Sequence, residues 1–215
     1  KNPVKQLVDA YEKIKSSKFG AILTVIKVPD NQTKRYGIAS QYETASGIIT
    51  DASGNILVIG SFYGTTDFDP GAGIFNITSS GANDAYVLKL NSLGNFVWAK
   101  SLGGAASDFP NAIDLDASGN MYIVGQMSGV ADLNPSATSY TVAAYGGQDA
   151  FVTKWDINGN FVWGASMGGT LGDQAMDVKV NNAGTSVFIT GWFNGTGVEL
   201  SPFCSCGTEA SAGGS

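Results

Sequence analysis

Histidine is absent from the 215-residue sequence, and charged residues make up only 14% of it. Without histidine the chain lacks the commonest transition-metal ligand and the usual general base at neutral pH. Ser-His-Asp and Cys-His mechanisms within this chain are therefore excluded. Twelve basic residues are scattered among eighteen acidic ones, for a net charge of −6. Nucleic-acid binding needs clustered Lys and Arg, so we expect no nucleic-acid partner.

Long apolar runs and cysteines are also scarce. No apolar stretch approaches the roughly 18 residues of a membrane helix, so we expect no membrane span. The only cysteines are Cys204 and Cys206. They suggest either a soft-metal site, which two ligands leave incomplete, or pairing beyond this chain. The sequence opens with Lys1 instead of Met, which is typical of a processed or excised piece.

Glycine and apolar residues, by contrast, are abundant. The sequence contains 29 Gly, and 43% of its residues are hydrophobic. Many glycines with few charges are typical of short strands joined by tight turns. The apolar content is high enough to bury a core, which argues against disorder.

An internal repeat is the main feature of the sequence. Residues 84–104 and 149–169 are identical at twelve of twenty-one positions, with an offset of 65 and no gap. The stretches that begin at Ser46 and Asn111 match at the same offset, and a third copy begins at Met176. A second landmark recurs once per copy, as TTDFDP at 65–70, VADLNP at 130–135 and GVELSP at 197–202. The chain thus holds about two and a half copies of one unit.

Each copy divides into four strands. In the first copy they are expected at 46–50, 56–62, 84–90 and 96–101, from β-branched and alternating apolar runs. A further short strand is expected near GIFNIT. Four antiparallel strands repeated along the chain predict an all-β fold of β-propeller blades, each unit having roughly 65 residues. The expected divisions are 41–105 for repeat 1, 106–170 for repeat 2 and 171–215 for a partial repeat 3.

The N-terminal part differs from the repeats. Apolar residues at 3.6-residue spacing predict an amphipathic helix within 1–18, with Asn2 as its cap and Pro3 at its first position. This helix either covers an edge of the first blade or binds a partner. The region 19–40 contains a strong strand and is either half a blade or the tail of another domain.

The repeat carries a resemblance to a known family. Its DA-[YF]-V, GN-F-V-W and DASGN elements, with the DFDPG variant at 67–71, resemble the bacterial repeats named for the seven-bladed beta-propeller. The resemblance implies a propeller in an exported, secreted or cell-surface bacterial protein. It implies no catalytic residue and no defined ligand. Because closed propellers have about four to eight blades, we expect further blades of a longer chain or a homo-oligomer to complete the fold.

Acidic loops are the candidate metal sites. Asp51 and Asp116 open DASGN segments, which we interpret as turns in which the Asp side chain binds its own backbone. A calcium loop is the alternative interpretation. Better calcium candidates are Asp67 and Asp69 in the first copy, with Asp132 and Asn134 in the second. The alternative there is again a turn, with the side chains accepting backbone N–H groups.

The remaining candidates are aromatic. Trp155 and Trp192 interrupt the repeat, since their counterparts are Leu90 and Gln126, and we take them as candidate ligand contacts. Acidic residues recur once per copy, which is typical of scaffold residues and not of a single active site. The leading hypothesis is a non-catalytic module that binds a protein or a glycan or acts as a scaffold. A propeller-type carbohydrate-active enzyme and a calcium-stabilised structural repeat are the alternatives. No cofactor other than calcium is expected.

Overall fold

The structure is all-β. The computed structural model describes residues 21–27, 32–38 and 43–194, and every paired strand in them is antiparallel. This described part contains no helix, and hence none that is long and apolar enough to cross a membrane. The expected helix within 1–18, the GVELSP segment and both cysteines lie outside the described residues.

Fourteen strands are present in the described ranges. They are β1 Ala21–Lys27, β2 Gln32–Ile38, β3 Thr44–Thr50, β4 Ile56–Phe62, β5 Thr65–Asp67, β6 Asn76–Thr78, β7 Asp84–Leu90, β8 Phe96–Gly104, β9 Phe109–Leu115, β10 Met121–Asp132, β11 Thr141–Trp155, β12 Phe161–Met167, β13 Gln174–Val180 and β14 Val187–Trp192.

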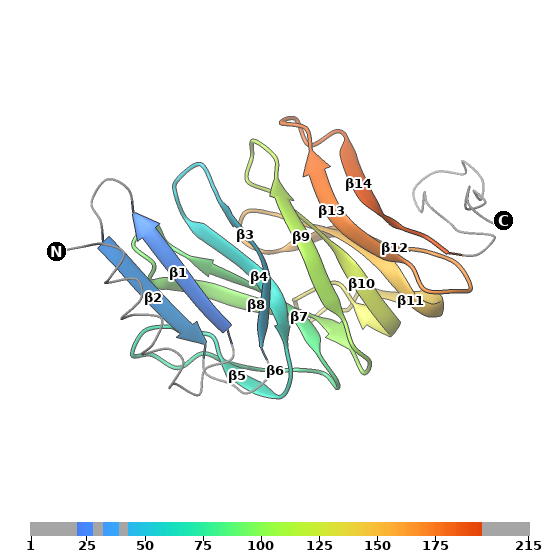
Figure 1. The fold of residues 1–215 in the computed structure, drawn as a ribbon, viewed down its shortest axis with the longest axis horizontal. Helices are drawn as coiled ribbons and strands as arrows, with labels where there is room; N and C mark the ends of the chain where they lie inside the picture. Colours follow the sequence, from blue (N-terminus) through green and yellow to red (C-terminus); the bar gives the residue numbers. More distant parts are fainter. Residues whose placement is uncertain (1–20, 28–31, 39–42, 195–215) are drawn as a thin grey trace.

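These strands form units that repeat as the sequence does. The first unit has the order β3-β4-β7-β8 and the second the order β9-β10-β11-β12, both in chain order. The hairpin β13–β14 begins a third unit, and β1–β2 form a separate hairpin. Figure 1 shows the units side by side in chain order. Four-stranded antiparallel units in series are β-propeller-like, and the described strands form an open array and not a closed ring.

Each unit also carries an insert between its second and third strands. In the first unit the insert contains the hairpin β5–β6, in which Asp67 pairs with Asn76. In the second unit the extended ends of β10 and β11 pair in the same way, with Asp132 opposite Thr141. Both pairs are related by the offset of 65, so the landmark containing Asp67 and Asp132 occupies the same structural place in the two units.

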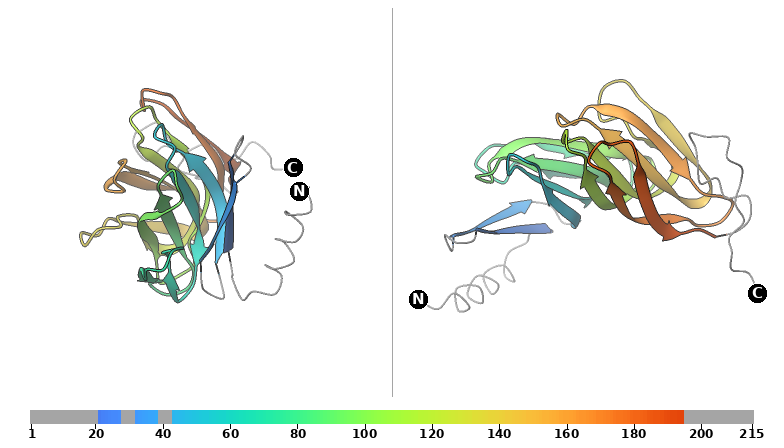
Figure 2. Two further views of the ribbon diagram at one scale, coloured as in Figure 1. Left: turned by 90° about the vertical axis from the view of Figure 1, so that its left-hand side faces the viewer. Right: turned by 90° about the horizontal axis from the view of Figure 1, so that it is seen from above.

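The main core lies between the units. Leu57, Ile59 and Val87 of the first unit pack in one cluster with Met121 and Phe151 of the second. Two further clusters cover the outer face of the first unit and the face of the second unit toward β13–β14. Neighbouring units therefore bury one another's apolar faces, and Figure 2 shows them fanned in chain order when seen from above.

Because each central strand lies between two clusters, both of its faces are buried. Strand β7 has no exposed residue, although its sequence alternates, and even Lys89 is 7% exposed. The ammonium group of Lys89 lies 3.2 Å from an oxygen of Asp51, which compensates its charge. The alternation thus separates two apolar environments, and it does not separate a core face from a solvent face.

One glycine in each unit is required by a close backbone approach. A Cβ at Gly60 would lie 1.8 Å from the carbonyl oxygen of Thr44, and one at Gly125 would lie 2.0 Å from that of Phe109. The register shifts beside these glycines mark β-bulges in β3 and in the β9–β10 pairing. Gly191 repeats the arrangement in β14, opposite the carbonyl of Gln174.

Candidate functional site

The DASGN segments form turns held by their aspartate. Oδ1 of Asp51 accepts hydrogen bonds from the backbone N–H groups of Ser53 and Asn55, each at 2.9 Å. Gly54 takes a φ of 75°, as such a turn requires. The turn interpretation is thus confirmed for Asp51, and Asp116 makes the same bonds to Ser118 and Asn120.

The carboxylates of these turns favour their charged form. Burial by itself would raise the pKa of Asp51, but hydrogen bonds from Asn55, Lys89 and Ser53 hold that pKa below its ordinary value. The pKa of Asp116 is lowered in the same way, against the effect of burial, by bonds from Asn120, Ser118 and Tyr122. The carboxylate oxygens of Asp51 and Asp116 therefore accept hydrogen bonds within their own turns and stabilise them.

The calcium candidates of the first insert also hold a turn. Oδ1 of Asp67 accepts hydrogen bonds from the backbone N–H groups of Asp69, at 3.0 Å, and Phe75, at 2.8 Å. Oδ1 of Asp69 accepts one from Gly71 at 2.7 Å. The structure brings the two residues into one loop, with one oxygen of each bound to backbone.

The second insert repeats this arrangement. Oδ1 of Asp132 accepts hydrogen bonds from Asn134 at 3.0 Å and from Tyr140 at 2.8 Å, and Oδ1 of Asn134 accepts one from Ser136. Nowhere in the described ranges do three or more acidic, histidine or cysteine side chains gather as a metal site would need. Calcium binding at either insert stays a prediction, and the backbone bonds explain why an oxygen-bearing side chain recurs there.

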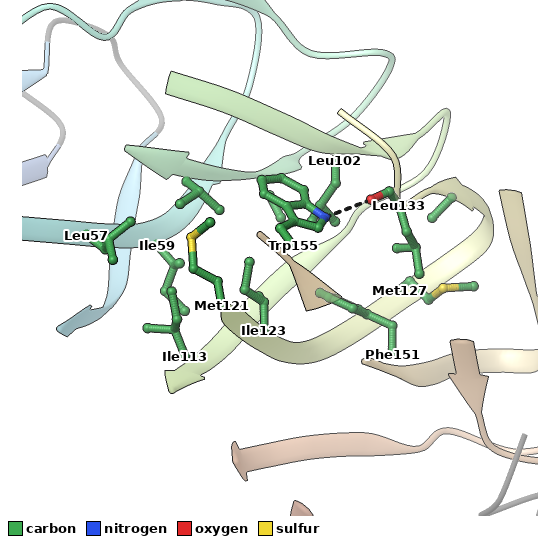
Figure 3. Close-up of a cluster of buried hydrophobic side chains, with 13 residues drawn as sticks. Leu57, Ile59, Leu102, Ile113, Met121, Ile123, Met127, Leu133, Phe151 and Trp155 are labelled. Atoms are coloured by element: carbon green, nitrogen blue, oxygen red, sulfur yellow. Dashed lines mark hydrogen bonds between the residues drawn. The ribbon is translucent and has the colours of Figure 1, made fainter. Parts of the chain in front are cut away.

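Trp155 belongs to the core between the units. Its side chain is 0% exposed, and its indole N–H donates a 3.0 Å hydrogen bond to the carbonyl oxygen of Leu133 (Figure 3). Leu102, Met121 and Phe151 belong to the same cluster. No surface of this ring is left for a ligand, so we assign Trp155 to the core and not to ligand contact. Its counterpart Leu90 packs in the outer cluster of the first unit.

Trp192, at the end of β14, is accessible. It is 45% exposed, and its indole N–H donates to Oε1 of Gln174 at 3.0 Å. One edge of the ring is thus positioned by β13, while much of the ring faces solvent. Trp192 stays a candidate ligand contact.

Two buried carboxylates meet at the junction of the units. Asp84 begins β7 and Asp108 precedes β9, and both are buried. A Cβ on Gly103 would lie 2.8 Å from Oδ1 of Asp84 and 2.9 Å from Oδ2 of Asp108, so the two carboxylates border the same point of β8. Burial raises the pKa of Asp84 to about 6. Burial, and secondarily the charge of Asp84, raises the pKa of Asp108 to about 7.

The second unit contains an equivalent pair. Asp149 and Asp173 are both buried, and a Cβ on Gly168 would lie 2.8 Å from Oδ2 of Asp149 and 2.7 Å from Oδ2 of Asp173. Burial, with a smaller contribution from the charge of Asp173, raises the pKa of Asp149. Acid pairs with raised pKa values occur in glycoside hydrolases, but these pairs have no exposed face for a sugar.

The sequence shows that these aspartates recur once per copy, but not that the two carboxylates of a pair border the same glycine. The available signal was the constant spacing: Asp84 precedes Asp108 by 24 residues, and Asp149 precedes Asp173 by the same number. The two-glycine segment that follows FVWAKSL or FVWGASM lies between the partners in both copies. Two aspartates that keep the same spacing on either side of a glycine in both copies indicate a structural contact within the repeat.

Comparison with known proteins supports the repeat architecture. The chain is 30% identical over 156 residues to an uncharacterized WD repeat-containing protein of Acanthamoeba polyphaga mimivirus. That match covers 68% of this chain and 11% of the viral protein, so the chain spans about a tenth of the length of its relative. No family model matches the chain. The relative and the antiparallel units together fit a β-propeller-like repeat, while the resemblance to the seven-bladed family stays a prediction.

Proposed function

We propose that this chain is a non-catalytic, β-propeller-like module that binds a partner protein through the inserts of its units. The observation that carries the proposal is the exposure of large apolar side chains in the insert of each unit. The central strands are buried against neighbouring units, and each insert exposes large apolar side chains; the outer strands expose further ones, such as Val97 and Val162. A similarity to a WD repeat-containing protein supports a role in protein interaction.

The inserts have the character of a contact surface. In the first unit Ile74 is 78% exposed, and Phe75 and Tyr63 are also exposed. In the second unit Tyr145 is 71% exposed, with Tyr140 nearby in sequence. Aromatic residues are enriched at protein interfaces, and apolar side chains that project from rigid hairpins lose little entropy when a partner covers them. Of these residues, Phe75 and Tyr140 occupy equivalent positions at the offset of 65, so successive units place an aromatic ring at the same point of the insert.

The location of the protein and the alternative of glycan binding are proposed from the family resemblance. A bacterial, secreted or cell-surface repeat of the seven-bladed type would place the inserts where extracellular proteins or glycans can reach them. Trp192 is the candidate to stack on a sugar ring, since it is 45% exposed. We favour protein binding because both inserts expose a large apolar side chain, Ile74 in the first and Tyr145 in the second.

Site-specific photo-cross-linking tests the proposal. A photoreactive amino acid at Ile74 or Tyr145 should cross-link a defined partner, identified by mass spectrometry, from the native source. The same group at Ser53, an exposed position of a DASGN turn, is the matched control. Equal labelling at Ser53, or none at either insert, would contradict binding through the inserts. A glycan array with wild type and Trp192→Ala separates sugar binding from protein binding.

A further inference from the structure

The acid pairs lie at the seam between neighbouring units. The carboxylate of Asp108 accepts hydrogen bonds from Gly104 at the end of β8, at 2.8 Å, and from Ser128 of β10, at 3.3 Å. These are the strands that join the first unit to the second, where Ala131 pairs with Gly104. Asp173 makes the corresponding bonds to Gly169 and to Asn194, both at 2.7 Å. Each pair therefore includes one carboxylate that links consecutive units.

The other member of each pair has an oxygen without a hydrogen-bond partner. Oδ2 of Asp84 accepts a bond from the N–H of Ser80, and Oδ2 of Asp149 accepts one from Tyr145, each at 2.8 Å. Oδ1 of Asp84 and Oδ1 of Asp149 are buried and have no hydrogen-bond partner among the described residues. A buried carboxylate oxygen is costly to leave unpaired when it is charged.

No basic side chain of residues 43–194 compensates the pairs. These residues contain four lysines against thirteen acidic residues, and each lysine binds elsewhere. Lys89 contacts Asp51, Lys100 donates to the carbonyl of Gly159, Lys154 contacts Asp116 and Lys179 contacts Asp114. Within the described ranges, the only charge that acts on the pKa of Asp108 is that of Asp84, and the only one that acts on Asp149 is that of Asp173.

Two facing carboxylates without a cation cannot both be ionised at little cost, and such a dyad keeps one proton. Calcium would need six or more oxygen ligands, and the described residues assemble no group of three acidic side chains. A proton needs only the two carboxyl groups. We propose that each pair, Asp84 with Asp108 and Asp149 with Asp173, shares one proton and so forms a pH-sensitive clamp at the seam between neighbouring units. This inference does not depend on the proposed function.

The direction of the pH effect follows from the raised pKa values. The folded protein holds the proton more tightly than the unfolded chain, whose aspartates have a pKa near 3.8. The clamp's contribution to stability is therefore fully present below about pH 4 and is lost as the pH rises through about 6 to 7. Each unit of pKa shift corresponds to a tenfold change in the folding equilibrium. For Asp84 with Asp108 we expect a loss of at least about tenfold between pH 5 and pH 8. The raised pKa of Asp149 gives the second pair a loss in the same direction.

Denaturant unfolding of the 215-residue chain at pH 5, 6, 7 and 8 tests the clamp. Wild type should lose stability across this range, whereas Asp84→Asn with Asp149→Asn should lose much less, because the amide keeps the shape and supplies the donor without a charge. The control Asp177→Asn, at an exposed position of β13, should keep the wild-type slope. A flat wild-type profile, or an unchanged slope in the double variant, would overturn the proposal.

Two further measurements do not depend on the variants folding. Carbon-13 NMR titration of wild type should show one carboxyl of Asp84 and Asp108 titrating above pH 5, with the pKa of Asp149 also raised above its ordinary value. Titration of both Asp84 and Asp108 below pH 5 would overturn the shared proton. The loss of melting temperature between pH 5 and pH 8 should be the same with calcium and with a chelator, whether or not calcium binds at the inserts. A smaller loss with calcium would show that a cation occupies the pair instead of a proton, and so would also overturn the proposal.

Discussion

Lys89 and Asp51 form a buried ion pair that also connects two units. The Lys89 ammonium lies 3.2 Å from Oδ2 of Asp51 within the first unit, and it donates a 3.2 Å hydrogen bond to the carbonyl oxygen of Ile157 in the second. Both side chains are almost fully buried. One cation thus satisfies the turn of its own unit and a turn of the next.

Replacing this lysine should therefore destabilise the fold strongly. Lys89→Met keeps the apolar stem but leaves the Asp51 carboxylate buried without its cation, and removing one partner of a buried pair costs about 3–5 kcal/mol. Urea unfolding at pH 7 measures the change. Lys179→Met is the matched control, because Lys179 is 66% exposed beside Asp114 and such pairs contribute at most about 1 kcal/mol. Equal losses in the two variants would show that Lys89 does not act through burial.

The turn aspartates predict a second pH dependence, at acid pH. The pKa values of Asp51, Asp116 and Asp156 lie below their ordinary value, because hydrogen bonds outweigh the effect of burial. Their contribution to stability is present above the unfolded pKa near 3.8 and is lost as the pH falls through the lower folded values. We expect stability to fall steeply below about pH 4, as circular dichroism across pH 2 to 5 would show. Asp116→Asn should reduce this acid-limb slope, and an unchanged slope would contradict the assignment.

The repeat made much of the fold predictable. An offset of 65 shared by two copies fixed the strands near 46–50, 56–62, 84–90 and 96–101, and all four are present. It also predicts the DASGN turns, because the Asp side chain can bind the backbone N–H groups two and four residues further on without any distant partner. Strands and turns that depend on local contacts and recur along the chain can therefore be predicted from one sequence.

Contacts between units were not predictable in the same way. The interruption of the repeat at Trp155 suggests a ligand contact, yet Trp155 fills the space beside Leu102 and Leu133 in the core between the units. The approach of Asp84 and Asp108 to the same glycine, Gly103, is unpredictable for the same reason. Each depends on how one unit rotates against the next, and the offset between copies holds no information about that rotation.

A glycine in the second strand of each unit should tolerate no side chain. A Cβ on Gly125 would lie 2.0 Å from the carbonyl oxygen of Phe109 and 2.9 Å from the ring of Phe151. Gly125→Ala must therefore displace the backbone. We expect the free energy of unfolding to fall by about 3 kcal/mol, the upper end of the range for overpacking substitutions. Urea unfolding is the measurement.

Gly64→Ala is the control for this substitution. Gly64 has a φ of 77° but nothing within 4 Å of its added Cβ. The control should cost only the strain of a left-handed residue, about 1 kcal/mol. Equal losses for Gly125→Ala and Gly64→Ala would contradict the close approach of the Phe109 carbonyl as the reason for a glycine at position 125.

Substitution of the two tryptophans that interrupt the repeat should lower stability to very different extents. Trp155→Ala removes a fully buried ring from the core between the units and leaves the carbonyl of Leu133 without its donor. Removing a buried aromatic side chain costs about 3–5 kcal/mol, so this variant should unfold at much lower urea concentration. Trp192→Ala removes a half-exposed ring and one exposed hydrogen bond to Gln174, and it should cost less than about 1 kcal/mol.

Fluorescence separates the two positions directly. In variants that keep either Trp155 or Trp192 as the single tryptophan, the other three being replaced by Phe, Trp155 should be shielded from acrylamide and Trp192 should be quenched, since one is fully buried and the other half exposed. Trp155→Phe, which fills most of the same space, should recover much of the stability lost in Trp155→Ala because volume is largely kept. If instead Trp155→Ala were as stable as wild type, the apolar contact between neighbouring units would not be what holds the two blades together.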